Sequence, residues 1–452
     1  MIKHFINKLS DSSPPIKRRE ISRDKHSVRV EDVSPFALEV VDELRDAGYQ
    51  AYLVGGCVRD AILDLAPKDF DVATDATPEQ VKRLYRRARI IGRRFQIVHV
   101  QNRHEVIEVT TFRGHHDSKS SNSHKRRRGE PAARKSGKGM LMRDNVFGSM
   151  EEDAVRRDFS CNALYFDTDT EAVIDFIGGF DDLKDGLLRT IGDAGKRFQE
   201  DPVRMMRAIR FQAKLGLRLD KESQRQLAKK SSLILEVSAA RLFDEVIKLL
   251  LHPKAVRAFE LFNESGLFRQ LFPASAKQAE ENQQLAQLLD IGVQNTEQRL
   301  SIDKGVSPFY LYATLLWPAL QPQFVQLIAS NESPSRAMER ATSSVLAEQA
   351  QFVSIPKRFA LAIRDTWYLQ TQLDRRQGDR AERLLAHPKF RAAYDFLLMR
   401  EASGENLNGL GNWWTKYQEA GTDTREEMRN SLPPSGKKHR RRRNRRKKPP
   451  TN

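Results

Sequence analysis

The sequence predicts an α+β protein in which a small head of mixed strands and helices precedes an almost wholly helical region. At 452 residues the chain is longer than one hydrophobic core usually requires, so two or three domains are expected. Up to about residue 190, short β-rich runs alternate with helix-start signals. From about Gly192 apolar residues recur at helical spacing and strands essentially stop.

The head is expected to begin at Ser34, after a polar lead-in over residues 1–33 whose composition predicts disorder. Ser34 and Pro35 form an N-cap with proline at the first helical position, and Gly48 ends that helix. Thr77 opens a second helix. The predicted strands are Gln50 to Val54, Phe70 to Thr74, Gln96 to Gln101, Glu105 to Phe112 and Ala163 to Phe166.

Apolar periodicity predicts successive helices in the second half of the chain. They cover Asp201 to Leu215, Ala239 to Leu251, Ala255 to Ser265, Pro308 to Leu315 and Phe359 to Leu373.

The formal net charge of +17 indicates a polyanionic partner. The positive charge gathers in a basic loop at about residues 114–140 and in the segment from Lys437 to Lys448. Neither stretch interleaves apolar residues as a membrane-lying helix does, which favours nucleic acid over lipid. The predicted RNA-binding residues are Arg126, Arg127, Arg128, Arg440, Arg441, Arg442, Arg443, Arg445 and Arg446.

Cys57 and Cys161 cannot by themselves form a disulfide framework or a four-ligand zinc site, which favours a reducing cytoplasm. The N-terminus lacks the apolar segment of a secretory signal, and no run is long enough to span a membrane. We therefore expect a cytoplasmic protein without a membrane partner.

A glycine pair between a predicted strand and a helix indicates a phosphate-binding turn. In LVGGCVRD, Gly55 and Gly56 allow backbone amides at a helix start to approach a triphosphate. Arg59 either adds a charge-assisted contact or braces Asp60 and the turn. A glycine pair alone is more often an ordinary strand-to-helix turn.

Two carboxylates follow this turn. Asp69 and Asp71 flank Phe70 on a predicted strand, so the period of two places both carboxylates on one face. Their repulsion is relieved by a divalent cation, and Mg²⁺ is usually held by one or two carboxylates plus substrate phosphates. The pattern predicts a site for Mg²⁺, or Mn²⁺, at which phosphoryl transfer occurs.

A third carboxylate has two candidates. Glu108 lies on a neighbouring predicted strand, and Asp158 follows two arginines. For each residue alone, an ion-paired surface acid is as plausible as a catalytic role.

A helix expected to begin at Asp201 carries Asp201, Arg204 and Arg207 on one stripe. An arginine donor beside an aspartate acceptor matches the N1 and N6 positions of adenine and rejects uracil and guanine. Cytosine presents the same order, so this pattern leaves ATP and CTP open. An intrahelical salt bridge is the structural alternative.

Taken together, five segments resemble the bacterial class II nucleotidyltransferases, which comprise tRNA CCA-adding enzymes and poly(A) polymerases. These segments are LVGGCVRD, KDFDVATDATP, IEVTTFR, RRDFSCNALYFD and EDPVRMMRAIRFQAKLGLRL. The resemblance implies a nucleotidyltransferase head followed by all-α neck, body and tail domains. It also implies metal ligation by Asp69 and Asp71, an active-site role for Asp158, and base selection by Asp201 and Arg204. The chain departs from the family at Ser160 and Cys161, where Thr-Ile is usual.

Other segments resemble the poly(A) polymerase branch of this family. They are IIGRRFQIVHV, the basic loop led by FRGHH, LFDEVIKLLLHPKA, HPKFRAAYDFLLMR and the arginine-rich tail. This resemblance implies addition of AMP from ATP to RNA 3′ ends, linked to RNA-decay factors. A CCA-adding enzyme and a non-catalytic RNA-binding protein remain the alternatives. The expected domains are a head over 34–190, a neck over 191–255, a body and C-terminal domain over 256–420, and a disordered polybasic tail over 421–452.

Overall fold

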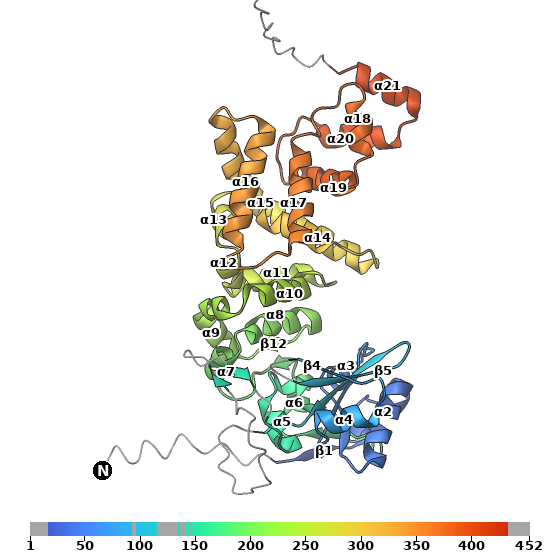
Figure 1. Ribbon diagram of the computed structural model, residues 1–452. Coiled ribbons are helices and arrows are strands. Elements are labelled where there is room, and N and C mark those ends of the chain that lie inside the picture. The colour runs from blue at the N-terminus through green and yellow to red at the C-terminus, as the bar shows by residue number, and fades with distance from the viewer. Residues whose placement is uncertain (1–16, 93–95, 115–133, 136–140, 144–145, 433–452) are drawn as a thin grey trace, which may run out of the picture. The chain divides into compact units, whose positions relative to one another are not determined.

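The computed structural model describes residues 17–92, 96–114, 134–135, 141–143 and 146–432. The chain divides into two compact units, Met1–Leu271 and Phe272–Asn452 (Figure 1). The first contains a mixed sheet and helices, and the second is helical in its described part. The predicted α+β class is confirmed.

An eight-stranded sheet organises the first unit, in the order β1-β10-β9-β2-β3-β6-β5-β4. β3 and β6 are parallel, whereas the other neighbouring strands are antiparallel. The strands are β1 (Arg19–Ile21), β2 (Ala51–Val54), β3 (Asp71–Thr74), β4 (Arg89–Ile91), β5 (Ile97–Gln101), β6 (Val106–Thr111), β9 (Leu164–Phe166) and β10 (Val173–Asp175). The five strands expected from the sequence are confirmed, whereas β1, β4 and β10 are additional.

One face of the sheet is buried by helices over β3, β6 and β5. Val72, Val109 and Val98 are register neighbours on this face and are almost inaccessible to solvent. They pack under α2 (Pro35–Asp46) and α4 (Pro78–Leu84), which contact these strands and each other. The Ser34 cap and the capping box at Thr77 are present, as the sequence predicts. The other face of β6 and β5 carries partly exposed polar residues.

The described part of the predicted disordered lead-in is folded. Strand β1 pairs with β10, and Ile21, Val28 and Val33 are buried. The prediction of disorder rested on the polar composition of the whole segment. Burial of these few apolar residues against the sheet is sufficient to order residues 17–33. Two 3₁₀ helices follow β1, η1 (Arg23–Lys25) and η2 (Val30–Asp32).

Helices dominate the rest of the first unit. They are α3 (Gly56–Ile62), α5 (Met150–Arg156), η3 (Ser160–Asn162), α6 (Gly179–Lys184), α7 (Ala194–Glu200), α8 (Val203–Leu215), α9 (Lys221–Lys230), η4 (Ser231–Glu236), α10 (Ala239–Leu250), α11 (Ala255–Glu264) and α12 (Leu267–Leu271). A short parallel pair, β11 (Leu187–Leu188) and β12 (Arg218–Leu219), joins the segment before α7 to the segment after α8. The helix expected from Asp201 begins at Val203 instead.

Part of the predicted basic loop has regular structure. β7 (Arg134–Lys135) and β8 (Leu141–Arg143) form an antiparallel pair. Most of the loop, residues 115–133 and 136–140, lies outside the described residues.

The second unit consists of nine described helices. They are α13 (Pro273–Glu281), α14 (Gln283–Ser301), α15 (Pro308–Ala329), α16 (Pro334–Gln349), α17 (Lys357–Gln370), α18 (Arg380–Leu385), α19 (Phe390–Ala402), α20 (Leu410–Glu419) and α21 (Thr422–Asn430). Helix α15 continues through Pro318 and Pro322, beyond the predicted end at Leu315. An internal proline costs about 3 kcal/mol, which burial of the neighbouring Trp317 and Leu320 helps to offset.

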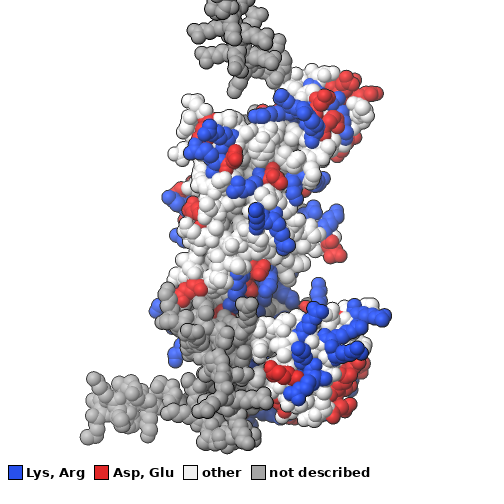
Figure 2. All heavy atoms as spheres, in the orientation of Figure 1, with Lys and Arg blue, Asp and Glu red and all other residues white. Residues whose placement is uncertain are grey.

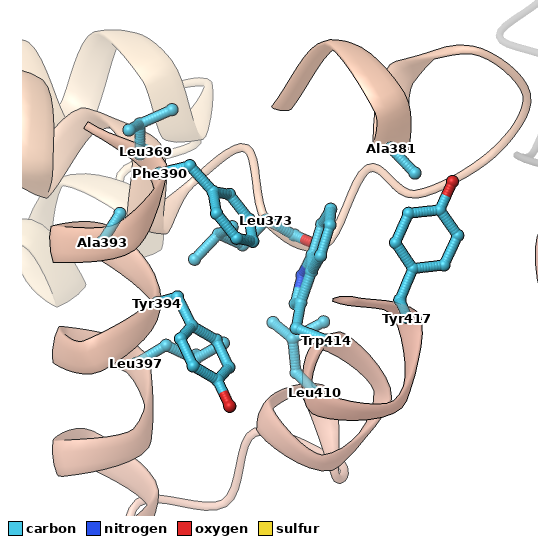
Figure 3. Packing of buried hydrophobic residues seen from close by; sticks show 10 residues of the cluster. All are labelled: Leu369, Leu373, Ala381, Phe390, Ala393, Tyr394, Leu397, Leu410, Trp414 and Tyr417. Atoms are coloured by element: carbon cyan, nitrogen blue, oxygen red, sulfur yellow. The ribbon is translucent and has the colours of Figure 1, made fainter. Parts of the chain in front are cut away.

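The aromatic core of α17 to α20 lies in this unit. The rings of Phe390 and Trp414 pack edge to face with their centroids 5.0 Å apart, and they lie side by side in this core (Figure 3). The Trp414 indole donates a 3.0 Å hydrogen bond to the Leu373 carbonyl. The predicted disordered tail is wrong for residues 422–430, because Met428 of α21 packs against this core and Arg425 hydrogen-bonds back to the Tyr417 carbonyl.

Both cysteines are free and buried. Burial raises the pKa of Cys57 to about 11 and that of Cys161 to about 12, so neither is a reactive thiolate at neutral pH. Within the described ranges, no helix is long and apolar enough to cross a membrane.

Candidate active site

The Gly55 turn joins the end of β2 to the start of α3. Gly55 has φ +78°, in the region that favours glycine, and Gly56 is the first residue of the helix. A Cβ added at Gly55 would lie 3.3 Å from Nη1 of Arg157 and 3.9 Å from Oδ2 of Asp71. Because Gly55 has no side chain, its backbone can lie close to Arg157 and Asp71.

Arg59 and Asp60 belong to a buried hydrogen-bond network. Arg59 is buried and donates to Asp60 Oδ1 at 2.8 and 2.5 Å and to Asn162 Oδ1 at 2.6 Å. Asp60 also pairs with Lys214 of α8 at 3.2 Å. Of the two roles predicted for Arg59, the structure supports bracing. Asp60, also predicted to bind nucleotide, has both of its oxygens engaged in this buried network.

Asp69 and Asp71 lie at the entrance to β3. Asp71 is its first residue, whereas the exposed Asp69 lies in the turn just before the strand. Phe70 between them is buried, as predicted. Burial, reinforced by the charges of Glu108 and Asp69, raises the pKa of Asp71 to about 6, against the opposing influence of Arg157 and Arg59. The carboxylates therefore repel one another at a partly buried position.

Glu108 is the carboxylate that the fold brings beside Asp71. The two residues are direct register partners on the parallel strands β3 and β6, so their side chains share one face. On the next strand His99 is the register partner of Glu108, and its Nε2 lies 3.2 Å from Glu108 Oε1. His99 was not predicted from the sequence, because only the strand register brings it here.

These carboxylates are suited to a cation supplied together with a substrate. In the described part of the chain, no group of three or more His, Cys, Asp or Glu side chains is arranged to hold a metal ion. Mg²⁺ does not need such a cage, because it commonly binds one or two carboxylates plus substrate phosphates. Burial first, and then the charges of Glu108 and Asp69, raise the pKa of Asp71, and a divalent cation bound there would offset the cost of its negative charge. The residues present fit such an ion.

Asp158 lies in a different environment from Asp71. Its Oδ2 lies 2.6 Å from Nε and 2.5 Å from Nη2 of Arg207, and its Oδ1 accepts a 3.0 Å bond from Asn162. Burial alone would raise the pKa of Asp158, but Arg207 and Asn162 outweigh it and hold the pKa well below its usual range. Arg207, predicted to contact nucleotide, is therefore engaged by Asp158, and this pair links α8 to the segment before η3.

Arg157 is a site residue that sequence reasoning passed over. Its Nε and Nη2 each donate to Asp153 Oδ2 at 3.1 Å, and its guanidinium lies over the Tyr165 ring. Burial alone would lower its pKa, but Tyr165 and Asp153 outweigh it and keep Arg157 charged. It therefore presents a fixed positive charge at the Gly55 turn. Its place directly before Asp158 was the available signal.

The side chains of Asp201 and Arg204, the pair predicted to read the base, each contact other residues. Asp201 caps the end of α7, and its two oxygens lie 3.2 and 3.3 Å from the Arg241 guanidinium. Arg204 donates through Nη1 to the Arg197 carbonyl at 3.0 Å and to Glu200 at 3.5 Å. The prediction that Asp201 and Arg204 share one helical stripe is wrong, because Pro202 caps a helix that starts only at Val203. Arg241, distant in sequence, was missed.

The predicted RNA-binding arginines cannot be placed. Arg126 to Arg128 and the arginines of the terminal run, Arg440 to Arg446, lie outside the described residues.

Three protein families match successive segments of the chain. Residues 51–189 match the poly A polymerase head domain, and residues 216–278 match the probable RNA and SrmB-binding site of polymerase A. Residues 330–448 match the polymerase A arginine-rich C-terminus.

Individual proteins are similar over most of the chain. Poly(A) polymerase I of Escherichia coli O6:H1 is 42% identical over 91% of this chain and 88% of its own length. Poly(A) polymerase I of Haemophilus influenzae is 39% identical over 93% and 92%. The CCA-adding enzyme of Lactobacillus johnsonii is 34% identical over only 52% of this chain and 55% of its own.

A solved structure shares the fold. The Thermotoga maritima CCA-adding enzyme, complexed with tRNA, is 18% identical with a TM-score of 0.56, covering 90% of this chain and 89% of that one.

Proposed function

The chain belongs to the bacterial poly(A) polymerase family, and we propose that it adds AMP from ATP to RNA 3′ ends at a centre formed by Asp69, Asp71 and Glu108. It is a nucleotidyltransferase that acts without a template. The single observation that carries the site assignment is the register of Asp71 and Glu108 beside the Gly55 turn. This places acidic side chains next to an amide-rich, positively charged turn, as transfer of a nucleotidyl group requires.

The phosphate side of the site is formed by Gly55, Gly56 and Arg157. Backbone amides at the start of α3 approach the triphosphate without interference from a side chain. Arg157 is held by Asp153 before any ligand arrives, so little reorganisation is needed when phosphate charge develops beside it. Arg59 and Asp60 fix the helix to α8 and act through its position.

The acidic side of the site holds the cation and the attacking group. We propose that Asp69 and Asp71 bind Mg²⁺, or Mn²⁺, with the ATP phosphates. The bound ion supplies charge neutralisation at the transferring and leaving oxygens. Glu108 and Asp71 together orient the 3′-hydroxyl of RNA. Because Asp158 is paired with Arg207, we assign the third carboxylate to Glu108 and give Asp158 a positioning role.

Selection of adenine is proposed to involve Asp201 and Arg204, with Arg241 holding the Asp201 carboxylate. Within the described residues, the Arg204 side chain donates its hydrogen bonds through Nη1, so Nε and Nη2 are the atoms we propose to face the base. Since adenine and cytosine present the same donor and acceptor order at the relevant edge, preference for ATP must also depend on the size of the base.

We propose that RNA is also bound outside the catalytic centre. Helices α9 to α12 fall in the segment whose family is described as a probable RNA and SrmB-binding site. We further expect the protein to act in the cytoplasm and its adenylated products to enter RNA decay.

Product length separates this function from its alternatives. The protein is incubated with Mg²⁺, each nucleoside triphosphate separately and all four together, and either single-stranded RNA or tRNA lacking its CCA end. A long ladder with ATP alone is expected. Addition that needs CTP and stops after CCA would indicate the CCA-adding activity, and binding without extension would indicate an RNA-binding protein.

A further inference from the structure

The strand order divides the central sheet into two sides around Asp71. On one side lie β2 and β9, with the Gly55 turn and the neighbouring Arg157. On the other side lie β6, β5 and the edge strand β4. If ATP phosphates occupy the Gly55 side, RNA must approach from the side of Glu108, because the two substrates meet at the carboxylates.

One row of side chains crosses this second side. Asp71, Glu108, His99 and Arg89 are successive register partners on β3, β6, β5 and β4, so all four belong to the same face. Their other-face neighbours Val72, Val109 and Val98 are buried, whereas His99 and Glu108 remain partly exposed and Arg89 is exposed. The row therefore leads from the catalytic carboxylates across an open face to a cation at the sheet edge.

Arg89 belongs to a wider group of positive charges. Around the sheet edge, the end of α4, which covers the opposite face, and the turn into β4 contain four more exposed cations, Lys82, Arg83, Arg86 and Arg87. Within the described ranges, none of these five side chains forms an ion pair or a hydrogen bond. Figure 2 shows Lys and Arg side chains gathered on the head in the area where Figure 1 labels β4 and β5. Unpaired cations of one sign indicate an anionic partner.

We infer that the α4–β4 cations, Lys82, Arg83, Arg86, Arg87 and Arg89, bind backbone phosphates of the RNA upstream of its 3′ end. The inference deepens the proposed function and rests on it. The group includes no aromatic side chain exposed for base stacking, since Tyr85 is buried with its hydroxyl bonded to the Val40 carbonyl. Contacts are therefore to phosphates and independent of RNA sequence.

The distance along the row determines which RNAs reach the group. Three strand spacings of about 4.8 Å separate Asp71 from Arg89, so the cation lies about 14 Å from the carboxylates. A primer engaged only at its 3′ end is too short to use the whole group. Longer RNA gains contacts that a trinucleotide lacks.

The test replaces Arg86, Arg87 and Arg89 together by glutamine in the full-length chain. A matched control replaces Lys17, Arg18 and Lys25, exposed cations near the opposite sheet edge at β1, by glutamine. A third variant carries lysine at positions 86, 87 and 89, which keeps the charge. Measurements are the affinity for a long single-stranded RNA as a function of salt, and kcat/KM for that RNA and for a trinucleotide primer.

Loss of three phosphate contacts should make the slope of log affinity against log salt less negative by about 2, since each contributes about 0.7 on a single strand. Affinity should fall about tenfold, a modest loss because exposed charge contacts are individually weak. The kcat/KM ratio of long RNA to trinucleotide should fall similarly, the KM for ATP should stay constant, and the lysine variant should retain the slope.

An unchanged salt slope in the glutamine variant would overturn the inference and point to a protein partner. Equal losses in the β1-edge control, or equal losses for the trinucleotide, would also overturn it. If the unaltered protein transfers no AMP to either primer, the proposed function itself fails, whereas the RNA affinity and salt slope still report on the surface.

Discussion

Replacing Asp71 by asparagine should stabilise the metal-free protein while it removes activity. In the folded chain, burial and the nearby carboxylates of Glu108 and Asp69 raise the pKa of Asp71 from 3.8 to about 6. One pKa unit corresponds to about 1.4 kcal/mol, so the charged carboxylate costs the fold about 3 kcal/mol at neutral pH. Asparagine removes this charge at nearly the same volume.

The sign of the pH dependence follows from the two pKa values. Below pH 3.8 Asp71 is protonated in both states, so the variant gains nothing from its neutrality. As pH rises toward 6, the unfolded carboxyl releases its proton before the folded one, and wild-type stability falls relative to the variant. The advantage of Asp71→Asn should therefore appear between these two pKa values and stay constant above them.

Urea denaturation with EDTA, followed at several pH values, measures this difference. Asp69→Asn is the matched control, and because Asp69 is exposed its gain should be smaller. Added Mg²⁺ and ATP should stabilise the wild type more than Asp71→Asn. A variant equal to or less stable than the wild type at neutral pH would refute the view that repulsion at this position is unrelieved without a cation.

Three further changes test other parts of the site. Arg207→Met should cost about 3–5 kcal/mol in urea denaturation because it leaves the largely buried Asp158 carboxylate unpaired, whereas Asp158→Asn should cost less because the Arg207 side chain is 36% exposed; additive losses in the double variant would contradict the pairing. Gly55→Ala should cost about 1–3 kcal/mol, because φ +78° with ψ −121° is a backbone conformation that alanine rarely adopts, and it should lower kcat by displacing Arg157, whereas wild-type kinetics would remove Gly55 from the phosphate turn. Arg204→Leu should reduce the preference for ATP over UTP about tenfold or more in competition assays, and an unchanged preference would exclude it from base reading.

Local patterns predicted strand β3 and the Gly55 turn before it. Gly55, Asp69 and Asp71 lie within one strand-turn-helix-strand segment, so spacing and period were sufficient to place them near one another. Glu108 was identified as one of two candidates because its strand alternates, but only the parallel register of β3 and β6 distinguishes it from Asp158.

The remaining features depend on contacts between residues far apart in the sequence, which local patterns do not predict. Composition classed residues 17–33 as disordered, yet β1 is ordered by pairing with β10, far away in sequence. Arg241 reaches Asp201 from α10, and Arg207 engages Asp158 from α8. A charged residue has many possible partners of opposite charge in the sequence. Which of them it pairs with depends on tertiary packing.

The rate of a single AMP addition tests the central claim most directly. With saturating ATP, Mg²⁺ and RNA, single-turnover transfer is compared among the wild type, Asp71→Asn and Glu108→Gln, with folding of each variant checked by its denaturation curve. We predict a loss of at least about a hundredfold for both variants, as expected when a group that acts on transition-state charge is removed. Transfer within a few-fold of the wild-type rate by either folded variant would contradict the assignment of the catalytic centre to these carboxylates.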